Sequence, residues 1–468
     1  MSAGEAVEHL KRLQKLGERV VGVNELVKVY PFDGAVAFMK AMQRKFGWAQ
    51  PVPTPGFFGD RAPATVSIES GPNETATIFW GRFEIPGVDG YVECGFSRTD
   101  DNEPVFEIGG EVKQAHLAVV AELAQLTRQI ARDESIYRGK ALRLRINEDG
   151  DINVNAAPGF IDLRNRTELI LPDLVDASVR ANLLTPIERT DACRRAGIPV
   201  KRGVILSGPP GTGKTLAAFE VAHKCIENGW TFILVPKCKS LADAMLFATR
   251  YAPAVVFAED IDQITSGDRN EAFNHLLNTV DGVNTKNQDV MLVFTTNHLG
   301  NIERTMVRPG RIDAIIEFPP PDHATIERFL RYYGGSLIEP DMSLMRSCDA
   351  LEGAIPAIVR EAVERAKLYA LSRGADPDHI RLTDDDILVA VKTMEAHTVL
   401  PQQAGEGRDA GGTGRDRSQG AADRRYGSHG RNQVRHQTDR RPGSGVIAYT
   451  LHRPYRDYTI RALFPFLS

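Results

Sequence analysis

Residues 203–228 read GVILSGPPGTGKTLAAFEVAHKCIEN: a short apolar run, a glycine-rich loop and then a helical pattern. Backbone N–H groups of such a loop can surround phosphate groups, and the N-terminus of the following helix adds its dipole. In this order of elements we prefer a phosphate-binding loop to a structural glycine-rich turn. The expected binding residues are Gly208, Pro209, Pro210, Gly211, Thr212, Gly213, Lys214 and Thr215. We expect Lys214 to neutralise β- and γ-phosphates and the Thr215 hydroxyl to bind Mg²⁺.

Acidic and amide side chains end two further apolar runs. Residues 254–262 read AVVFAEDID and residues 291–297 read MLVFTTN. Ligands of open α/β sheets lie at the carboxyl ends of the strands, and a phosphate site also needs a metal-binding carboxylate and a group that activates water. We therefore predict that Glu259, Asp260 and Asn297 complete the site, with Glu259 as a second metal ligand. A solvated acidic turn and a turn asparagine are the alternatives.

Two arginines flank a Pro-Gly turn in residues 307–313, VRPGRID. The turn places them outside any buried helix, so a surface salt bridge is one role open to them. An arginine that reaches the γ-phosphate of a neighbouring subunit explains the pair better. Arg308 and Arg311 are therefore predicted catalytic residues.

Five short and nearly continuous apolar runs alternate with helical stretches. They are Val204–Leu206, Phe232–Val235, Ala254–Phe257, Val290–Phe294 and Ala314–Glu317. Such runs are typical of a parallel sheet that is buried on both faces by crossover helices. After the prolines at 319–321 only helical patterns follow, at 323–333, 342–349, 354–373 and 383–396. The sequence predicts an α/β fold, a doubly wound parallel sheet plus a small helical lid.

The segment before this sheet mixes two periodicities. Alternating stretches at 76–85, 91–96 and 105–112 predict an antiparallel meander, and residues 114–133 carry one apolar stripe at helical spacing. We read an α+β domain without a catalytic constellation, suited to binding a client or partner. The predicted domains are residues 1–166 (N-terminal domain), 167–321 (phosphate-binding subdomain), 322–398 (lid) and 399–468 (tail).

Composition excludes several classes of protein. The 468 residues are 25% charged and 42% hydrophobic, with a net charge of −4, so the chain as a whole has no general electrostatic attraction to nucleic acid or anionic membrane. Apolar runs are too short for a membrane span, and the first ten residues lack the pattern of a signal peptide. The five cysteines are dispersed without a C-x-x-C pair, which favours buried thiols in a reducing compartment. We expect a cytoplasmic protein.

The tail differs from the rest of the chain. Residues 401–445 hold ten glycines and nine arginines against five acids, a net charge of +4, and almost no large aliphatic side chains. They cannot bury enough apolar surface to offset the entropy lost on ordering. We favour a solvated linker over an arginine-rich nucleic-acid-binding tail. The abrupt change of composition is also consistent with out-of-frame translation of a GC-rich gene.

Four motifs and the helical segments after them together resemble the AAA ATPases of the wider AAA+ class. The motifs are GIPVKRGVILSGPPGTGKT (197–215), Glu259-Asp260, NHLLNTVDG (274–282) and TTNHLGNIERTMVRPGRID (295–313). The resemblance covers about residues 169–396. It implies a hexameric ring that binds ATP and Mg²⁺ between subunits and couples hydrolysis to moving a substrate.

The resemblance also assigns roles to single residues. By it, residues 208–215 are the Walker A loop and Glu259-Asp260 is the Walker B pair. Asn297 looks like sensor 1, and Arg308 with Arg311 look like the arginine fingers.

The Walker B pair departs from the family pattern, because most members have Asp-Glu where this chain has Glu259-Asp260. By the resemblance, the first carboxylate orients Mg²⁺ and its water and the second polarises the attacking water. Aspartate is one methylene shorter than glutamate, so Asp260 reaches about 1.5 Å less far, which slows hydrolysis unless something compensates. The inverted pair and the TTNHL motif resemble the AAA chaperones related to the mitochondrial translocase of the Rieske iron–sulfur protein. We therefore expect an active site.

Two other departures concern substrate handling and the lid. Members of the family that thread peptides carry an aromatic pore loop in the region of residues 236–253. Here Phe247 and Tyr251 lie four residues apart on a predicted helix, a spacing more typical of a core. Threading is therefore less favoured. Pro356 stands where the family's sensor 2 motif usually has glycine, and we read it as the first residue of a helix.

These observations predict an ATPase that acts as a homo-oligomeric ring and remodels or moves a macromolecular client, most simply a protein held by the N-terminal domain. An ATP-gated assembly switch with slow turnover is the alternative, suggested by the short pore segment and the inverted acids. A nucleic-acid remodeller is a third reading, and it rests on the arginine-rich tail alone.

Overall fold

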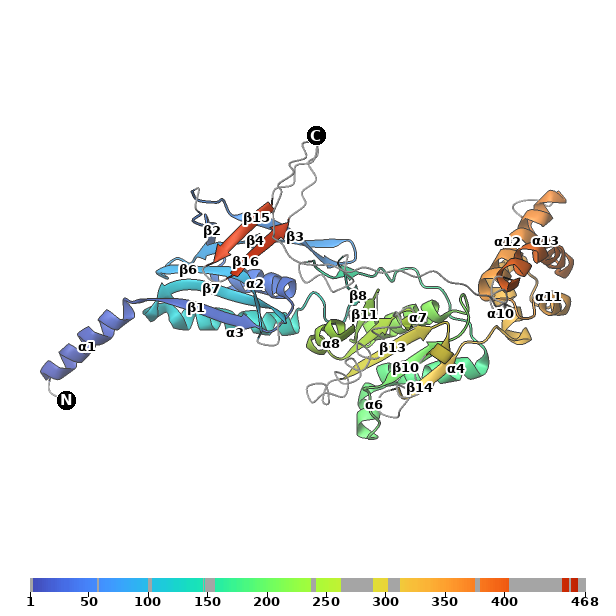
Figure 1. Ribbon diagram of the computed structural model, residues 1–468, viewed down its shortest axis with the longest axis horizontal. Helices are drawn as coiled ribbons and strands as arrows, with labels where there is room; N and C mark the ends of the chain where they lie inside the picture. The colour runs from blue at the N-terminus through green and yellow to red at the C-terminus, as the bar shows by residue number, and fades with distance from the viewer. Residues whose placement is uncertain are drawn as a thin grey trace, which may run out of the picture. The chain divides into compact units, whose positions relative to one another are not determined.

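The computed structural model describes residues 3–56, 59–99, 103–145, 147, 156–236, 241–261, 289–301, 312–374, 379–403, 448–453 and 456–461 (Figure 1). The chain divides into two compact units, Met1–Ala404 and Gly405–Ser468. In the second unit, strand β15 (Ala448–Arg453) pairs antiparallel with β16 (Arg456–Arg461). The remaining elements all belong to the first unit.

The N-terminal part of the first unit combines an antiparallel sheet with helices. Its elements are α1 (Ala3–Gly17), β1 (Val20–Val27), α2 (Pro31–Phe46), β2 (Gln50–Val52), β3 (Ala64–Gly71), β4 (Glu74–Trp80), β5 (Arg82–Glu84), β6 (Gly90–Arg98), β7 (Pro104–Lys113) and α3 (Leu117–Asp133). The sheet has the order β1-β7-β6-β5-β2, and β3 pairs with β4 alone. Alternate residues of β6 and β7, such as Val92 and Ile108, are buried, in the same core as Phe38 of α2 and Leu123 of α3. The predicted α+β fold of this part is confirmed.

A mainly parallel sheet forms the next part. Its strands are β8 (Ala141–Arg143), β9 (Gly159–Phe160), β10 (Gly203–Ser207), β11 (Thr231–Val235), β12 (Ala254–Ala258), β13 (Val290–Thr296) and β14 (Ala314–Glu317). The order is β14-β10-β13-β12-β11-β8-β9, and every neighbouring pair except β8 with β9 is parallel. Each of the five predicted strands is present. All residues of β10, β12 and β13 are buried, as near-continuous apolar runs predict.

Helices cover both faces of this sheet. Val255 and Phe257 of β12 share a core with α7 (Lys214–Glu227), whereas Val256 and Ala258 share one with α8 (Leu241–Arg250). Since successive side chains of a strand point to opposite faces, α7 and α8 lie on opposite sides of the sheet. This arrangement confirms the predicted doubly wound α/β fold.

The two strands at one side of this sheet, β8 and the edge strand β9, come from residues before position 166. The backbone of β8 pairs with β11 from Phe232 to Leu234, and β9 pairs with β8. The sequence predicts a strand near residues 140–146, but local alternation does not show which sheet it joins. A domain boundary at 166 therefore cuts through a continuous set of strand hydrogen bonds.

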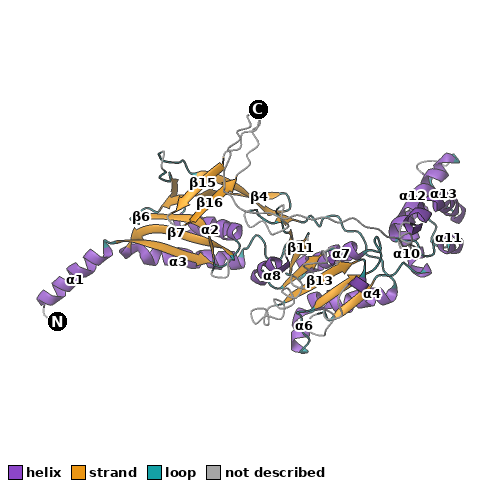
Figure 2. Cartoon of the chain, viewed as in Figure 1, coloured by secondary structure: helices purple, strands orange, loops and turns teal. Residues whose placement is uncertain are grey.

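Further helices lie between the strands of this sheet and after them. Between β9 and β10 lie α4 (Asp173–Val179), a π-helical turn (Arg180–Leu184), α5 (Thr185–Glu188) and α6 (Thr190–Arg195). After β14 come α10 (His323–Gly334), α11 (Met345–Ala350), α12 (Pro356–Ser372) and α13 (Asp384–Gln403). The described residues of this part of the chain form no strand (Figure 2). A separate core unites α10–α13. This is the predicted helical lid, and Pro356 is the first residue of α12, as expected.

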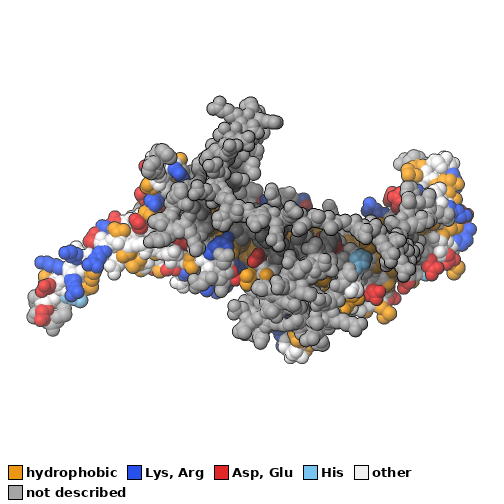
Figure 3. Space-filling model, viewed as in Figure 1, with side chains coloured by type: hydrophobic (Ala, Val, Ile, Leu, Met, Phe, Trp, Pro, Cys, Tyr) orange, Lys and Arg blue, Asp and Glu red, His pale blue; other side chains and the backbone are white. Residues whose placement is uncertain are grey.

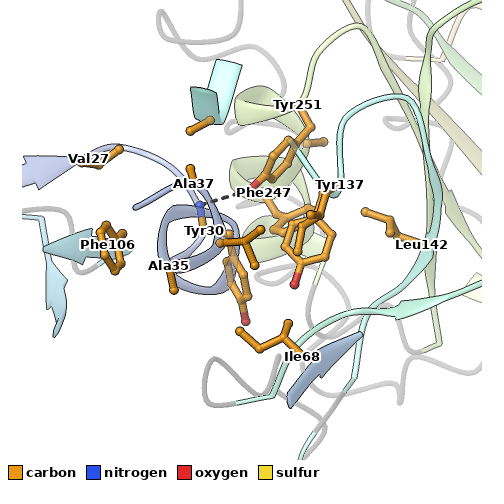
Figure 4. Close-up of a cluster of buried hydrophobic side chains, with 14 of the residues drawn as sticks. Val27, Tyr30, Ala35, Ala37, Ile68, Phe106, Tyr137, Leu142, Phe247 and Tyr251 are labelled. Atoms are coloured by element: carbon orange, nitrogen blue, oxygen red, sulfur yellow. Dashed lines mark hydrogen bonds between the residues drawn. The ribbon is translucent and has the colours of Figure 1, made fainter. Parts of the chain in front are cut away.

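An aromatic cluster joins the N-terminal part to the parallel sheet. Figure 4 shows Tyr30 of α2's N-cap, Tyr137, and Phe247 and Tyr251 at the end of α8 gathered together. The rings of Phe247 and Tyr251 lie 4.8 Å apart, and the Tyr30 N–H donates to the Tyr251 hydroxyl at 3.2 Å. Phe247 is 6% exposed and Tyr251 is 1% exposed, so both are core residues, as their helical spacing predicts.

The cysteines in the described part of the chain are Cys94, Cys193, Cys225 and Cys348, and all four are buried outside any disulfide. Burial raises the pKa of Cys94 and of Cys348 to about 11, which suits inert structural thiols. Cys238 lies outside the described residues. Within the described residues, helices long and apolar enough to cross a membrane are absent.

Candidate functional site

The glycine-rich loop between β10 and α7 has a backbone that larger residues cannot adopt. Gly208, Gly211 and Gly213 have φ values of +154°, +82° and +104°, in the region that favours glycine. A Cβ on Gly208 would lie 2.3 Å from the Phe318 carbonyl oxygen, and one on Gly211 would lie 2.7 Å from a methyl carbon of Ile355. The loop therefore keeps its shape only with glycine, which leaves its N–H groups accessible for phosphate binding.

Lys214 is held inside this loop. Its side chain is 7% exposed, and its ammonium donates to the carbonyl oxygens of Gly208 at 2.6 Å and Pro209 at 2.8 Å. The Thr212 hydroxyl also donates to the Pro209 carbonyl, at 2.9 Å. The positive charge of Lys214 is thus centred where the sequence predicts phosphate groups.

Thr215 and Glu259 meet at the carboxyl end of the sheet. The Thr215 hydroxyl at the start of α7 donates to Glu259 Oε1, after β12, at 3.1 Å. A hydroxyl and a carboxylate are oxygen ligands of the kind that Mg²⁺ prefers, and Mg²⁺ is usually held by one or two protein groups plus phosphate oxygens. The donor set therefore fits Mg²⁺. Clusters of three or more His, Cys, Asp or Glu with metal-binding geometry are absent from the described residues, so the phosphates would have to supply further ligands.

Asp260 is brought to Asn297. The Asn297 side-chain amide, after β13, donates to Asp260 Oδ1 at 3.2 Å. The Asp260 backbone N–H donates to the Thr295 hydroxyl at 3.0 Å. Asp260 has φ +49°, one of two non-glycine residues with positive φ in the described part of the chain. The structure thus brings Thr215 to Glu259 and Asn297 to Asp260 through two hydrogen bonds, and the sequence had singled out all four residues.

Some predicted residues lie outside the described part of the chain. These are the candidate arginine fingers Arg308 and Arg311, and the NHLLNTVDG motif at 274–282. Most of the tail, residues 404–447, also lies outside it. The roles assigned to these residues stay predictions.

A small cavity adjoins the Thr215–Glu259 pair. It has a volume of about 60 Å³ and is lined by Arg143, Ile161, Phe219 and Leu234 in addition to those two residues. Arg143 belongs to β8, which lies between β11 and the edge strand β9 and is far from the motifs in sequence. Local pattern contains no signal for its position, because the pairing of β8 with β11 is long-range. Thr295 was also missed, although a polar residue in a buried strand is such a signal.

The lid lies against the other end of the loop. A cavity of about 10 Å³ is lined by Thr212 of the loop, Phe318 after β14, and Phe329 and Pro356 of the lid, among others. Ile355, which precedes Pro356, limits the space beside Gly211. The described lid residues therefore contact the phosphate-binding loop through apolar side chains.

Comparison with known proteins supports this geometry. Residues 204–320 match the model of the AAA family, described as the ATPase family associated with various cellular activities. The chain is 32% identical over 228 residues to the 26S proteasome regulatory subunit 8 homolog of Saccharomyces cerevisiae, which covers 44% of this chain and 54% of the relative. It is 30% identical over 249 residues to the proteasome-activating nucleotidase of Methanoregula boonei, covering 49% and 56%.

The chain spans about half the length of the curated relatives it matches. The likeness therefore concerns the part that carries the phosphate-binding loop. Residues 204–320, which carry this loop, thus match the AAA family model, and about half of the chain is similar to proteasome regulatory ATPases.

Proposed function

We propose that this chain binds ATP with Mg²⁺ at the carboxyl ends of β10, β12 and β13, hydrolyses it, and couples the cycle to remodelling or moving a macromolecular client. The observation that carries the proposal is the pair of contacts Thr215–Glu259 at 3.1 Å and Asn297–Asp260 at 3.2 Å. They join three separate elements beside a glycine loop that holds a buried lysine. A glycine-rich turn with a purely structural role would not explain why these side chains converge beside it.

The contacts support a division of roles within the inverted acidic pair. Glu259 contacts the Thr215 hydroxyl, so these two residues would hold Mg²⁺, which when bound neutralises phosphate charge. Lys214 would bind the β- and γ-phosphates. Asp260 lies next to Asn297, so Asp260 would accept the proton of the attacking water while Asn297 fixes its carboxylate. The first acid therefore keeps the metal role and the second keeps the base role, as we expect from the resemblance to chaperones related to the Rieske-protein translocase.

We further propose that the chain works as a homo-oligomeric ring, with Arg308 and Arg311 reaching a neighbour's γ-phosphate. The names of the relatives describe a proteasome regulatory subunit and a proteasome-activating nucleotidase. Coupling to a macromolecular client is consistent with such relatives. The N-terminal α+β part is the candidate for binding a protein client, since it carries no catalytic motif.

The first test compares Lys214→Ala with Lys224→Ala on the same helix. Lys224 forms ion pairs with Glu188 and Glu227 at the surface, so it serves as a matched control. Steady-state phosphate release should fall at least about 100-fold for Lys214→Ala, because the phosphates lose their buried cation. Release should stay within twofold of wild type for Lys224→Ala. Equal rates for wild type and Lys214→Ala would contradict the proposal.

An ATP-gated assembly switch is the alternative function. It is favoured by the contacts of the N-terminal part with α8, where Phe247 and Tyr251 are core residues instead of pore residues. Sedimentation with ATP and a parallel phosphate assay separate the two. Turnover that rises when a client captured by an Asp260→Asn variant is added favours the motor. Assembly with ATP and negligible turnover favours the switch.

Nucleic-acid remodelling depends on the tail. Figure 3 shows basic and acidic side chains interspersed over the visible described residues, a pattern that does not favour a nucleic-acid face there. Deleting residues 401–468 and measuring binding to duplex DNA at several salt concentrations tests this reading. Salt-sensitive binding that the deletion abolishes would support a nucleic-acid function, and unchanged, salt-insensitive binding would remove it.

A further inference from the structure

We propose that Thr295 is a positioning residue for ATP hydrolysis, which holds Asp260 in the conformation that compensates for its short side chain. This inference rests on the proposed function. It concerns the contact between the end of β13 and the backbone of Asp260, a residue pair that the motifs alone do not connect.

The backbone of Asp260 has an unusual conformation. β12 ends at Ala258, whose partner on β13 is Phe294. Two residues later, Asp260 has φ +49°. A left-handed conformation is unfavourable for a non-glycine residue, and such outliers persist only where surrounding contacts determine them. The chain therefore turns sharply after Glu259, so that the Asp260 side chain takes a different direction from an extended strand.

A hydrogen bond to Thr295 determines this turn. The Asp260 N–H donates to the Thr295 hydroxyl at 3.0 Å, and Thr295 is 3% exposed. Instead of a ladder hydrogen bond to a backbone carbonyl, the N–H thus has a side-chain acceptor on the adjacent strand. Removing that acceptor takes away the contact that holds this N–H, and with it the backbone, in the turned conformation.

Asn297 follows the same strand end and contacts the Asp260 side chain. Its amide donates to Asp260 Oδ1 at 3.2 Å. Thr295 and Asn297 are two residues apart, so one holds the Asp260 backbone and the other holds its carboxylate. Thr296, between them, has a different partner, because its hydroxyl accepts from the His298 N–H at 3.0 Å. Two contacts from one strand end thus fix both ends of the catalytic aspartate.

These contacts explain how an aspartate can occupy a position usual for glutamate. The missing methylene shortens the reach by about 1.5 Å, and a misplacement of about 1 Å can cost about 100-fold in rate. Turning the backbone re-aims the carboxylate, and Thr295 holds that turn. Thr295 does not need to touch ATP for this purpose.

The test uses Thr295→Val, which keeps the shape of the side chain and removes the acceptor. Thr295→Ser restores a hydroxyl. Thr231→Val is the matched control, because Thr231 is also a buried strand threonine whose hydroxyl accepts a backbone N–H, from Gly139, at 3.0 Å. For each full-length variant we would measure kcat, KM for ATP, affinity for a fluorescent ATP analogue and the melting temperature.

We expect kcat to fall about 10- to 100-fold for Thr295→Val, with KM and analogue affinity within twofold of wild type. Thr295→Ser should recover most of the rate. Thr231→Val should lower the melting temperature with little change in kcat. If Thr295→Val does not fold, Thr295→Ala with the same measurements replaces it.

Unchanged kcat in folded Thr295→Val would overturn the inference, as would equal losses of kcat in Thr295→Val and Thr231→Val. The Lys214→Ala variant separates this failure from failure of the proposed function. Wild-type turnover that Lys214→Ala abolishes and Thr295→Val leaves intact removes the role of Thr295 alone. Turnover that is the same in all variants removes the proposed function as well.

Discussion

Asp33 is a carboxylate buried away from the candidate site, with 1% exposure at the start of α2. It accepts hydrogen bonds from the Ser135 hydroxyl at 2.8 Å and the Ile136 N–H at 3.0 Å. Burial raises the pKa of Asp33 to about 6, although these hydrogen bonds, one with Tyr251 and the charge of Arg138 lower it. Asp33 therefore changes charge in a pH range where exposed aspartates are already ionised.

The stability of the fold should depend on this group between about pH 4 and pH 6. The pKa of Asp33 is higher in the folded chain than its ordinary value of 3.8, so the folded state binds the proton more tightly. The contribution of Asp33 to the free energy of unfolding is fully present below pH 3.8 and is lost as the pH rises through about 6. The difference of about two pKa units corresponds to about 3 kcal/mol.

Replacement by asparagine tests this dependence. Asp33→Asn should gain stability relative to wild type between pH 4.5 and pH 7.5, as measured by thermal melting at each pH. Asp133→Asn, at a site that is about half exposed, is the control and should show no such shift. A pH-independent difference between wild type and Asp33→Asn would contradict the prediction.

At the scale of elements, the end of α8 is held by the turn that leads from α3 to β8. Arg138 donates to the carbonyl oxygens of Ala252 at 2.7 Å and Arg250 at 2.8 Å, which are among the last carbonyls near the end of the helix. Arg250 in turn pairs with Glu103 of the N-terminal part at 2.6 Å, with both side chains mostly buried. These contacts join the N-terminal part to the helix that precedes β12.

Arg138→Ala should destabilise the protein by about 2–4 kcal/mol, because two part-buried carbonyls lose charged donors and the guanidinium leaves the Tyr251 ring. Arg132→Ala is the matched control, since Arg132 is 73% exposed and, within the described residues, forms an ion pair with its neighbour Asp133 alone. That control should change stability by less than about 0.5 kcal/mol. Chemical denaturation of both variants measures the difference, and equal midpoints would rule out the predicted role of Arg138.

The elements that sequence predicted well have a local pattern. Strands β10 to β13 are almost entirely buried because both faces of the sheet are covered there, and the edge strand β14 is also a short apolar run. Helix α12 begins at a proline, so each of these elements could be recognised from a few consecutive residues. α2 was missed because Gly34 and several alanines interrupt an apolar stripe. In the structure Gly34 lies so close to Phe106 that a Cβ there would be 2.2 Å from the Phe106 Cβ. A small residue inside a helix is thus a packing feature that only the tertiary structure explains.

Part of the candidate site could also be predicted from local patterns, and the residues that could not be predicted have a physical reason. Lys214, Thr215, Glu259, Asp260 and Asn297 follow strands whose carboxyl ends meet, so their convergence could be predicted. The position of Arg143 could not, because it depends on the long-range pairing of β8 with β11. Thr295 stands out as a polar residue in a buried strand, but its contact depends on a positive φ at Asp260. Neither feature has a period or a motif in the sequence.

At the scale of the whole first unit, three hydrophobic cores divide the chain in a different way from the predicted domains. One core unites the N-terminal part with one face of the parallel sheet, a second covers the other face, and a third belongs to the lid. The N-terminal part and the sheet thus share buried contacts, whereas the lid has a core of its own. A client bound by the N-terminal part would therefore be attached to the same core as β12, which directly precedes Glu259 and Asp260.

The central claim is that this arrangement hydrolyses ATP with Asp260 as the base. The most direct measurement is the identity of the nucleotide retained after wild-type and Asp260→Asn proteins are incubated with ATP and Mg²⁺, separated from free nucleotide and denatured. The account predicts ADP in the wild type and mainly ATP in Asp260→Asn, because the variant binds ATP without activating water. The same ratio of ATP to ADP in both proteins would contradict it.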